Sequence, residues 1–457
     1  MKAVVLAAGR GQRLMPLTEK IPKPLVNVCG KPLLEHVLVY LSSVINEKDI
    51  IVVVGHRGNE IKRWLGMRWP EVVCVNVSEV KEGNYFSLIA AKDKIGNSPF
   101  ILVNADHIFC PDFLIKHFPV LSLVGGNEIF LACQGDREIY EDEMKVKIED
   151  GEVKIIDKNL DDYDGAYIGV ALINTPLQLW NSGDNLIRYS KKDDVRVEDV
   201  INSCALSKKP IWVDNAFFVE VDTVEDLLRG ELMTSRVLIF DLDGTLIDTI
   251  SAYKEKAAEI ISSFYNISLE HAKELYLKTC GLCFREQLEV IFPGHHLNDK
   301  ISKLFEEKKQ AIIKDIKIEE KIENVLKSLK ELGYIIAVSS NNLDKYARQI
   351  LRDLPVDYVL GWDGGAFKKG EAHINYLEKV TGFDRDYFLF FGDSVVDLKL
   401  MKKCKVRFIG IESTFTDKDF RKVTPDVIVL KDICNIMEII DRNGISFVPK
   451  SDCIFKN

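Results

Sequence analysis

The sequence predicts an α/β protein of two domains, each built on a parallel sheet covered by helices. Two observations favour this fold class. Short apolar runs typical of buried strands alternate with helix-length segments from the start of the chain. That pattern then begins afresh around residues 232–236, and 457 residues are enough for two or three hydrophobic cores. We therefore place one domain at 1–232 and the other at 236–457.

Composition and charge exclude several classes of function. Hydrophobic residues make up 47% of the chain and charged residues 29%, which is ordinary for a globular protein. The net charge is −9 and no basic block occurs, so we expect no nucleic-acid partner. No apolar run approaches the roughly 20 residues of a membrane helix, and the chain begins directly with a strand. With ten scattered cysteines, mostly in apolar runs, these features predict a cytoplasmic protein without a membrane partner.

The N-terminal half opens with a buried strand at 3–6 that leads into a glycine-rich loop, closed by Pro22-Lys23-Pro24-Leu25. Small residues let backbone N–H groups approach a phosphate closely, and Arg13 and Lys23 add positive charge. The loop lacks the third glycine of the dinucleotide pattern and the Gly-Lys-Ser/Thr of a P-loop. An ordinary turn is the alternative, but the combination favours a nucleoside triphosphate. The predicted binding residues of this loop are Leu6, Ala7, Ala8, Gly9 and Gly11.

Later elements of this half extend the predicted site. We expect a helix at 31–41, strands at 50–54, 71–77 and 100–103, and a hairpin over 145–156. Asp106 follows a strand end, where its carboxylate can hold Mg²⁺ or cap a helix. Alternation places Glu220 and Asp222 on one face of a later strand, so that one of them can join Asp106.

A Gly-Asn pair after the third strand is a second candidate for nucleotide contact. Gly83 and Asn84 open a helix that contains Ser87, within the segment 81–88. An amide and free backbone N–H groups at this place suit a base edge or a ribose. A simple capped helix start explains the same residues equally well.

The loop matches in full the pattern LAAGxGxRLxPLTxxxPKPL, and the N-terminal half therefore resembles the nucleotidyltransferases that activate sugar and alcohol phosphates. Its Gly-Asn-x-x-Ser-Leu segment, the Asp106-His107 pair and Asp164-Gly165 are similar to those of inositol-1-phosphate and phosphocholine cytidylyltransferases. The resemblance implies a Rossmann-like, GT-A-like sheet, Mg²⁺ and CTP. It also implies an acceptor phosphate near the hairpin, with Lys147, Lys158 and Gly169 as candidates. Glu220 stands where related sequences carry an aspartate, so we name it before Asp222 as second metal ligand.

The C-terminal half begins with a buried strand at 237–240 that delivers Asp241 and Asp243 at its end. Two carboxylates one residue apart can divide labour, one as nucleophile and the other as general acid and base. The further acidic residues of a calcium loop are absent. Strands at 335–338 and 388–391 end at Ser339 and shortly before Asp393, respectively.

These motifs, in this order, resemble those of the haloacid dehalogenase superfamily. The resemblance implies a Rossmann-like core with a small helical cap at about 251–316, whose loop contains Cys280 and Cys283. It also implies that Asp241 is the nucleophile and Asp243 the general acid and base. Ser339 and Lys369 (with Lys368 as the fallback) would bind the phosphoryl group. Asp241, Asp243 and Asp393 would hold Mg²⁺, and Asp397 would orient Lys369 or the metal shell.

Together the two resemblances imply a bifunctional enzyme with Mg²⁺ as its cofactor. One domain would transfer a nucleotidyl group, CMP from CTP by preference, to a phosphorylated sugar, polyol or alcohol. The other would hydrolyse a phosphomonoester of the same pathway through an aspartyl-phosphate. Alternatives are a thymidylyl-, guanylyl- or uridylyltransferase, a mutase in the second half, or a scaffold with inactive sites. A homo-oligomer is left open.

Overall fold

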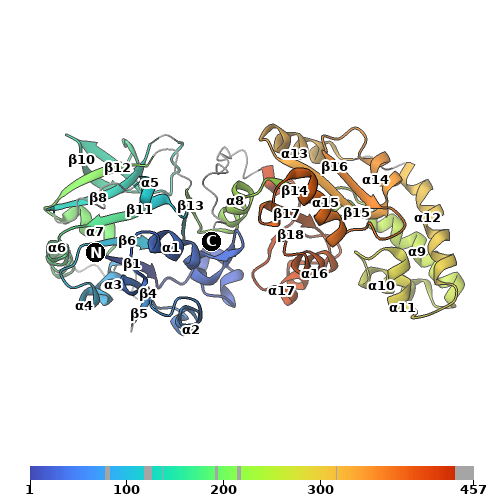
Figure 1. The fold of residues 1–457 in the computed structure, drawn as a ribbon, viewed down its shortest axis with the longest axis horizontal. Helices are drawn as coiled ribbons and strands as arrows, with labels where there is room; N and C mark the ends of the chain where they lie inside the picture. The colour runs from blue at the N-terminus through green and yellow to red at the C-terminus, as the bar shows by residue number, and fades with distance from the viewer. Residues whose placement is uncertain are drawn as a thin grey trace. The chain divides into compact units, whose positions relative to one another are not determined.

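The computed structural model describes residues 1–77, 83–117, 126–135, 137–190, 194–213, 218–314, 316 and 318–437. Lys81 and Glu82 of the predicted nucleotide segment, and the end of the predicted second domain at 438–457, lie outside the described residues. The described chain forms two compact units that divide between Gly230 and Glu231 (Figure 1). Among the residues described, no helix is both long and apolar enough to cross a membrane.

The N-terminal unit is built on a mixed sheet with strand order β10-β9-β11-β6-β1-β4-β5, in which β8 pairs with β11 and β12. The strands are β1 (Lys2–Ala7), β4 (Ile50–Val54), β5 (Val73–Asn76), β6 (Phe100–Asn104), β8 (Glu128–Gln134), β9 (Lys145–Glu149), β10 (Glu152–Asp157), β11 (Gly165–Ile173) and β12 (Ser207–Trp212). The central strands β6, β1, β4 and β5 run parallel, so their carboxyl ends share one edge. The predicted hairpin is the antiparallel pair β9 and β10.

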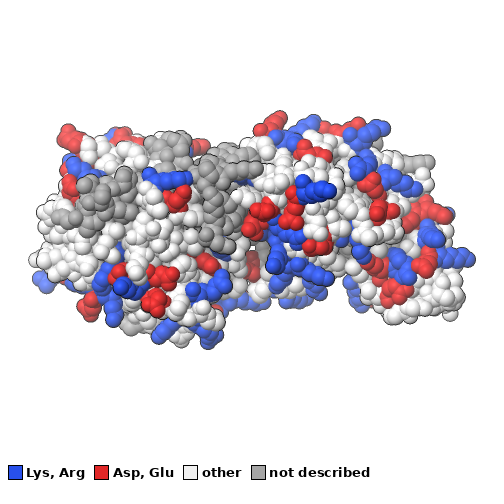
Figure 2. Space-filling view, in the orientation of Figure 1, with Lys and Arg blue, Asp and Glu red and all other residues white. Residues whose placement is uncertain are grey.

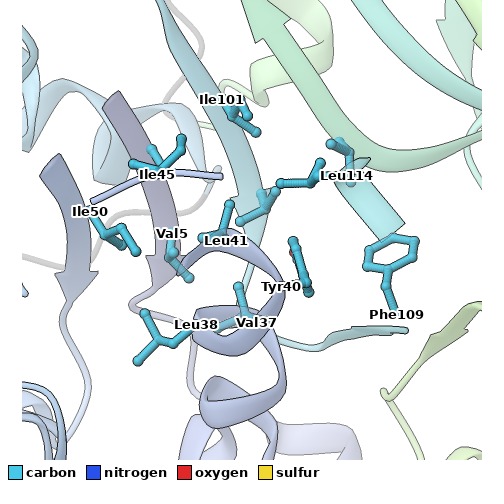
Figure 3. Packing of buried hydrophobic residues seen from close by; sticks show 14 of the residues in the cluster. Val5, Val37, Leu38, Tyr40, Leu41, Ile45, Ile50, Ile101, Phe109 and Leu114 are labelled. Carbon is cyan, nitrogen blue, oxygen red and sulfur yellow. The ribbon is translucent and has the colours of Figure 1, made fainter. Parts of the chain in front are cut away.

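Two hydrophobic cores lie on the two faces of this sheet because its central strands are apolar on both sides. Val5 of β1 points into the core under α1 (Leu33–Ser42) and α2 (Gly58–Arg68), whereas Val4 points into the opposite core. Figure 3 shows the first core, where Val37, Leu41 and other residues of α1 pack toward Val5. Helices of the other face are α3 (Tyr85–Ala90), α4 (Lys92–Ile95), α6 (Pro176–Ser190) and α7 (Val197–Ser203).

The predicted helix at 31–41 begins two residues late, at Leu33. Lys31 and Pro32 instead form β3, which pairs with β2 (Asn27–Val28). Pro32 has extended backbone angles and precedes the helix as its N-cap, so the first helical turn starts after it. A second small sheet joins β7 (His107–Phe109) to β13 (Phe218–Glu220).

The C-terminal unit contains a parallel sheet of order β16-β15-β14-β17-β18-β19. The strands are β14 (Val237–Phe240), β15 (Ile335–Leu343), β16 (Tyr358–Trp362), β17 (Phe388–Gly392), β18 (Arg407–Ile411) and β19 (Ile428–Leu430), and the helices beside them are α13 (Glu320–Glu331), α14 (Asp344–Ile350), α15 (Glu371–Thr381), α16 (Val395–Lys403) and α17 (Asp417–Val423). β14 is central, between β15 and β17, so the residues that follow it lie in the middle of the carboxyl edge.

The insertion after β14 forms a helical cap with a hydrophobic core of its own. It consists of α9 (Ile250–Tyr265), α10 (Leu269–Lys278), α11 (Phe284–Ile291) and α12 (Asn298–Lys314). Apolar residues at helical spacing, such as Tyr253 and Ala257 on α9, pack against Phe305 and its neighbours on α12. On the face drawn in Figure 2, basic and acidic side chains are interspersed over both units.

Candidate active sites

The glycine-rich loop after β1 is folded against the segment that contains Lys23. Gly11 has a positive φ of 64°, and a Cβ atom there would lie 2.7 Å from the Cβ of Lys23. The hydroxyl of Thr18 donates a hydrogen bond to the Gly11 carbonyl over 2.8 Å. Only glycine permits this close approach without strain. The structure therefore brings together the two parts of the loop that the sequence pattern associates.

Lys23 bridges two carboxylates at the carboxyl edge of the sheet. Its Nζ lies 2.6 Å from Oδ2 of Asp106, directly beyond β6, and 2.7 Å from Oδ1 of Asp222. Arg13 holds the other oxygen of Asp222 over 2.6 Å. Burial lowers the pKa of Lys23, but the two carboxylates outweigh burial and raise it overall. The pKa of Asp106 is lowered, because the nearby Lys23 and His107 outweigh the opposing effect of burial. Both partners are therefore charged.

A cavity of about 330 Å³ surrounds this cluster. Its lining residues are Leu6, Ala7, Gly9, Arg10, Gly11, Gln12, Arg13, Lys23, Pro24, Ala105, Asp106 and Asp222. Ala8 lies outside this set and is buried. Most of the loop residues predicted to bind a nucleotide therefore face one space, together with three cations and two carboxylates.

The predicted second part of the nucleotide site is engaged elsewhere in the structure. Gly83 has a positive φ, and a Cβ atom there would overlap the backbone of Val195. The Asn84 side chain accepts a hydrogen bond from the Val197 N–H over 2.7 Å, at the start of α7. Ser87 is buried on α3. None of these three lines the cavity, and packing against the segment before α7 explains the Gly-Asn pair. Their contact with a nucleotide stays a prediction.

Asp222 shares Lys23 with Asp106, whereas Glu220 shares the His107 ring with Asp106, so the choice of the second metal ligand stays a prediction. β13 ends at Glu220, and Asp222 belongs to the turn before α8 (Val224–Thr234), where its backbone N–H donates to Asp226. Strand alternation therefore does not extend to Asp222. Glu220 lies 3.6 Å from Nε2 of His107, and the same nitrogen lies 3.7 Å from Oδ1 of Asp106.

Three predicted acceptor-binding residues have partners or positions away from the cavity. Gly169 has a positive φ, and its missing Cβ leaves room for the buried ring of His107. Lys147 forms an ion pair with Asp162 over 2.9 Å. Lys158 directly follows β10. Acceptor contacts for these residues stay predictions.

In the C-terminal unit, a second lysine bridges carboxylates at the end of β14. Nζ of Lys369 lies 2.6 Å from Oδ1 of Asp241 and 3.0 Å from Oδ1 of Asp397. Carboxylate oxygens of Asp241, Asp393 and Asp397 lie within 4.8 Å of one another, and all three residues are buried. Gly244 has a positive φ, and a Cβ there would overlap the Asp393 carboxylate. The glycine of the Asp-x-Asp-Gly motif is thus required by a close approach.

These buried carboxylates crowd one another. Burial raises the pKa of Asp241 well above its ordinary range, Lys369 opposes this rise, and Asp397 and Asp393 add to it. Burial and then Asp397 raise the pKa of Asp393 to about 7. One lysine does not balance this much negative charge. The oxygen donors fit a hard divalent cation such as Mg²⁺, which would supply the missing charge.

Ser339 does not lie at a strand end, as the sequence predicts, because β15 continues to Leu343. Its hydroxyl is buried 2.9 Å from Nδ1 of His373, and burial lowers the pKa of that imidazole to about 4. Ser339 is absent from the cavity lining, whereas Asn341 and Asn342 belong to it. The sequence marks Asn341 and Asn342 only as two successive amides that follow the apolar run at 335–338 after two serines.

Asp243 is held by two side chains that the sequence analysis did not single out. The amide of Asn342 donates to its Oδ2 over 2.6 Å, and the Thr249 hydroxyl donates to its Oδ1. Both partners are buried. The carboxyl group is therefore fixed in rotation, as a positioned general acid requires.

The cap closes over this site and leaves a cavity of about 50 Å³. The lining residues are Asp241, Asp243, Ile250, Tyr253, Tyr276, Cys280, Gly281, Leu282, Cys283, Phe284, Gln287, Phe305, Lys309, Asn341, Asn342, Lys369 and Asp393. The carbonyl of Gly281 in the cap loop accepts a hydrogen bond from Asn341 of the core over 2.9 Å. Cys280 and Cys283 are free thiols in this loop, and burial raises the pKa of Cys283 to about 11.

Comparison with known families defines the class of each unit. Residues 2–117 match the nucleotidyl transferase family model, and residues 238–411 match the haloacid dehalogenase-like hydrolase model. The chain therefore carries a nucleotidyl transferase domain at its N-terminus and a haloacid dehalogenase-like hydrolase domain at its C-terminus. These matches agree with the two α/β units of the fold.

Individual relatives are similar to parts of the chain. It is 30% identical over 233 residues to "Bifunctional IPC transferase and DIPP synthase" from Aquifex aeolicus, which covers 50% of each chain. It is 36% identical over 107 residues to choline-phosphate cytidylyltransferase from Streptococcus pneumoniae, or 23% of this chain and 45% of that one. The chain spans about half the length of the curated relatives it matches. A solved haloacid dehalogenase-like hydrolase from Streptococcus pneumoniae gives a TM-score of 0.39 at 16% identity, covering 45% of this chain and 98% of the other.

Proposed function

We propose that the chain is a bifunctional enzyme whose N-terminal unit transfers a nucleotidyl group to a phosphorylated acceptor. The observation that carries this proposal is the cluster of Arg13, Lys23, Asp106 and Asp222 beside a loop whose small residues face one cavity. Cations for phosphate and carboxylates for a divalent ion meet there. That combination is what transfer of a nucleotidyl group requires.

The reaction needs no covalent intermediate on the protein. An oxygen of the acceptor phosphate attacks the α-phosphorus of the triphosphate, a new P–O bond forms, and the bond to the β-phosphate oxygen breaks, releasing pyrophosphate. Lys23 and Arg13 bind phosphate oxygens and neutralise their charge. Asp106 and Asp222 would hold Mg²⁺, which supplies further positive charge to the triphosphate when bound. Among the described residues, one oxygen of Asp106 is buried without a hydrogen-bond partner, as a vacant ligand atom would be.

We favour CTP as the donor and a sugar, polyol or alcohol phosphate as the acceptor. Support for CTP comes from the choline-phosphate cytidylyltransferase relative. The cavity has room for a triphosphate, with a volume of about 330 Å³. Thymidylyl, guanylyl and uridylyl transfer are the competing outcomes of the test below. Free thiols at every cysteine in the described part of the chain support a reducing compartment, the cytoplasm.

The C-terminal unit, in this proposal, hydrolyses a phosphomonoester. A carboxylate oxygen of Asp241 attacks phosphorus while Asp243 gives its proton to the departing alcohol oxygen. Asp243 then takes a proton from the water that cleaves the aspartyl-phosphate and restores Asp241. Lys369 binds phosphoryl oxygen and is held by Asp397. Asp241, Asp393 and the backbone carbonyl of Asp243 would hold Mg²⁺, with Asp397 completing the acidic group.

The test uses the full chain carrying Asp241→Asn, so that the phosphatase does not consume acceptor or product. Pyrophosphate release is followed with each of the four nucleoside triphosphates against a panel of polyol, sugar and amino-alcohol phosphates. We expect release with CTP and one acceptor class, and loss of that release in Asp106→Asn. Activity with another nucleotide alone would overturn the cytidylyl assignment. Silence with all four would overturn the transferase proposal and favour the scaffold alternative.

A further inference from the structure

One buried lysine of the cap has no part in the chemistry above. Lys309 comes from α12, and its Nζ lies 3.0 Å from Oδ1 of Asn342 and 3.3 Å from a carboxylate oxygen of Glu306. The ammonium also lies 4.8 Å from the ring centroid of Tyr253 and 5.1 Å from that of Phe305. Burying an ammonium is costly even with such partners, and an apolar side chain of the same shape would fill this space at lower cost. Stability alone therefore does not explain a lysine here.

The contact with Asn342 connects the cap lysine to the general acid. An ammonium only donates hydrogen bonds, so Lys309 requires the oxygen of the Asn342 amide to face it. The NH₂ group of the same amide is then turned toward Asp243, where it lies 2.6 Å from Oδ2. Because an amide can rotate by half a turn and exchange its two ends, Lys309 selects the orientation that serves Asp243.

We propose that Lys309 is a positioning residue that fixes the Asp243 carboxyl through Asn342, so that acid catalysis is complete only when the cap lies on the core. α12 belongs to the cap, whereas Asn342 and Asp243 belong to the core. A substrate that enters under an open cap would meet an Asp243 whose amide partner is unsupported. This inference rests on the proposed phosphatase activity and assigns that activity a dependence on cap closure.

The test compares two substrates that differ in their need for a general acid. The oxygen of an alkyl phosphate must be protonated as it leaves, whereas p-nitrophenolate leaves without a proton. We expect Lys309→Met in the full chain to lower kcat/KM for glycerol phosphates by about 10–100-fold and for p-nitrophenyl phosphate by less than about threefold. The value of kcat/KM includes only the steps up to departure of the leaving group. Its ratio between the two substrates therefore reports formation of the aspartyl-phosphate and not its hydrolysis.

The matched control is Lys308→Met, the neighbouring exposed lysine of the same helix, which should leave both substrates unchanged. Asn342→Ala cuts the same connection from the core strand and keeps the test open if Lys309→Met does not fold, which circular dichroism would reveal. It should reproduce the substrate-dependent loss, and the double variant should lose little more than either single one.

Three results would overturn the inference: equal losses with both substrates, no loss with either, or a change in KM alone. A lysine that simply stabilises the cap gives the first of these, and one that anchors an anionic substrate gives the last. If the unsubstituted chain hydrolyses neither substrate, the proposed phosphatase function itself fails. The two failures are thus separate.

Discussion

Lys23 in the N-terminal unit and Lys369 in the C-terminal unit each bridge two aspartates, at 2.6–2.7 Å in the first cluster and 2.6–3.0 Å in the second. The first cluster retains solvent contact, with side-chain exposures of 12–24%, whereas exposures in the second are 6% or less. The pKa of Asp106 is lowered and that of Asp241 is raised well above its ordinary range. A lysine between two aspartates therefore accompanies a lowered carboxyl pKa in the first cluster and a raised one in the second.

The difference comes from the charge around each bridge. Burial raises both carboxyl pKa values, but Lys23 and His107 reverse its effect at Asp106. At Asp241 one lysine faces additional carboxylates, among them Asp393. The first cluster is nearly balanced without a cation, whereas the second lacks positive charge. We therefore propose that a divalent ion, when bound, would contribute to the stability of the second site and mainly to the chemistry of the first.

The largest expected effect separates the two activities. Asp241→Asn removes the proposed nucleophile and should lower phosphate release by about 10⁴-fold or more, while pyrophosphate release by the other unit is unchanged. Asp106→Asn should do the reverse. Both products are measured on the same preparations with saturating Mg²⁺. Loss of both activities in either variant would contradict two independent sites.

Removing each lysine tests the charge balance directly. Lys369→Met leaves a group of buried carboxylates unpaired, and we expect it to lower the free energy of unfolding by about 3–5 kcal/mol in EDTA. Lys23→Met, where the carboxylates keep Arg13 and some solvent, should cost about 1–3 kcal/mol. Calorimetry of the full chain measures both, and Mg²⁺ should restore more of the loss in Lys369→Met. Equal costs would contradict the difference drawn between the clusters.

The pH dependence of stability should also differ between the sites when Mg²⁺ is removed. Asp393 has a pKa of about 7 against an ordinary value of 3.8. At a pH between these two values, the carboxyl group therefore holds a proton in the folded state and has lost it in the unfolded state. The stability of the C-terminal unit should therefore fall as the pH rises from about 4 to 7. Asp106 acts in the opposite sense, because its lowered pKa adds stability above its ordinary range and loses it on acidification. Hydrogen exchange followed by mass spectrometry, in the presence of EDTA, measures the stability of each unit separately. Asp393→Asn should reduce the fall in stability of the C-terminal unit between about pH 4 and 7.

The sequence predicts the frame of both sites well because the frame is local. Asp241 follows a strand that the apolar run at 237–240 defines, and the loop at Gly11 is marked by its own glycines. Contacts between distant segments are not visible in the same way. Asn84 accepts a hydrogen bond from Val197, and Lys309 donates one to Asn342. The sequence separations of these two pairs follow no periodic pattern.

The pair of candidates for the second metal ligand shows the same limit. Strand alternation predicts that Glu220 and Asp222 share a face, but the strand stops at Glu220 and the turn before α8 redirects Asp222 toward Lys23. A short strand thus removes the period on which the prediction depends. The position of His107 against Glu220, made possible by Gly169, is a packing solution that no local pattern shows.

The smallest predicted effect tests that assignment. Asp222→Asn should lower nucleotidyl transfer by about 100-fold, because it weakens the hold on Lys23 and Arg13 and removes a candidate ligand. Glu220→Gln keeps the shape of a half-exposed side chain that lies 3.6 Å from Nε2 of His107, so a change of less than about threefold is expected. Pyrophosphate release measured over a range of Mg²⁺ concentrations distinguishes the two, since only Asp222→Asn should shift the Mg²⁺ requirement. A larger shift of the Mg²⁺ requirement in Glu220→Gln than in Asp222→Asn would identify Glu220 as the metal ligand. It would also mean that His107 moves aside when the metal binds.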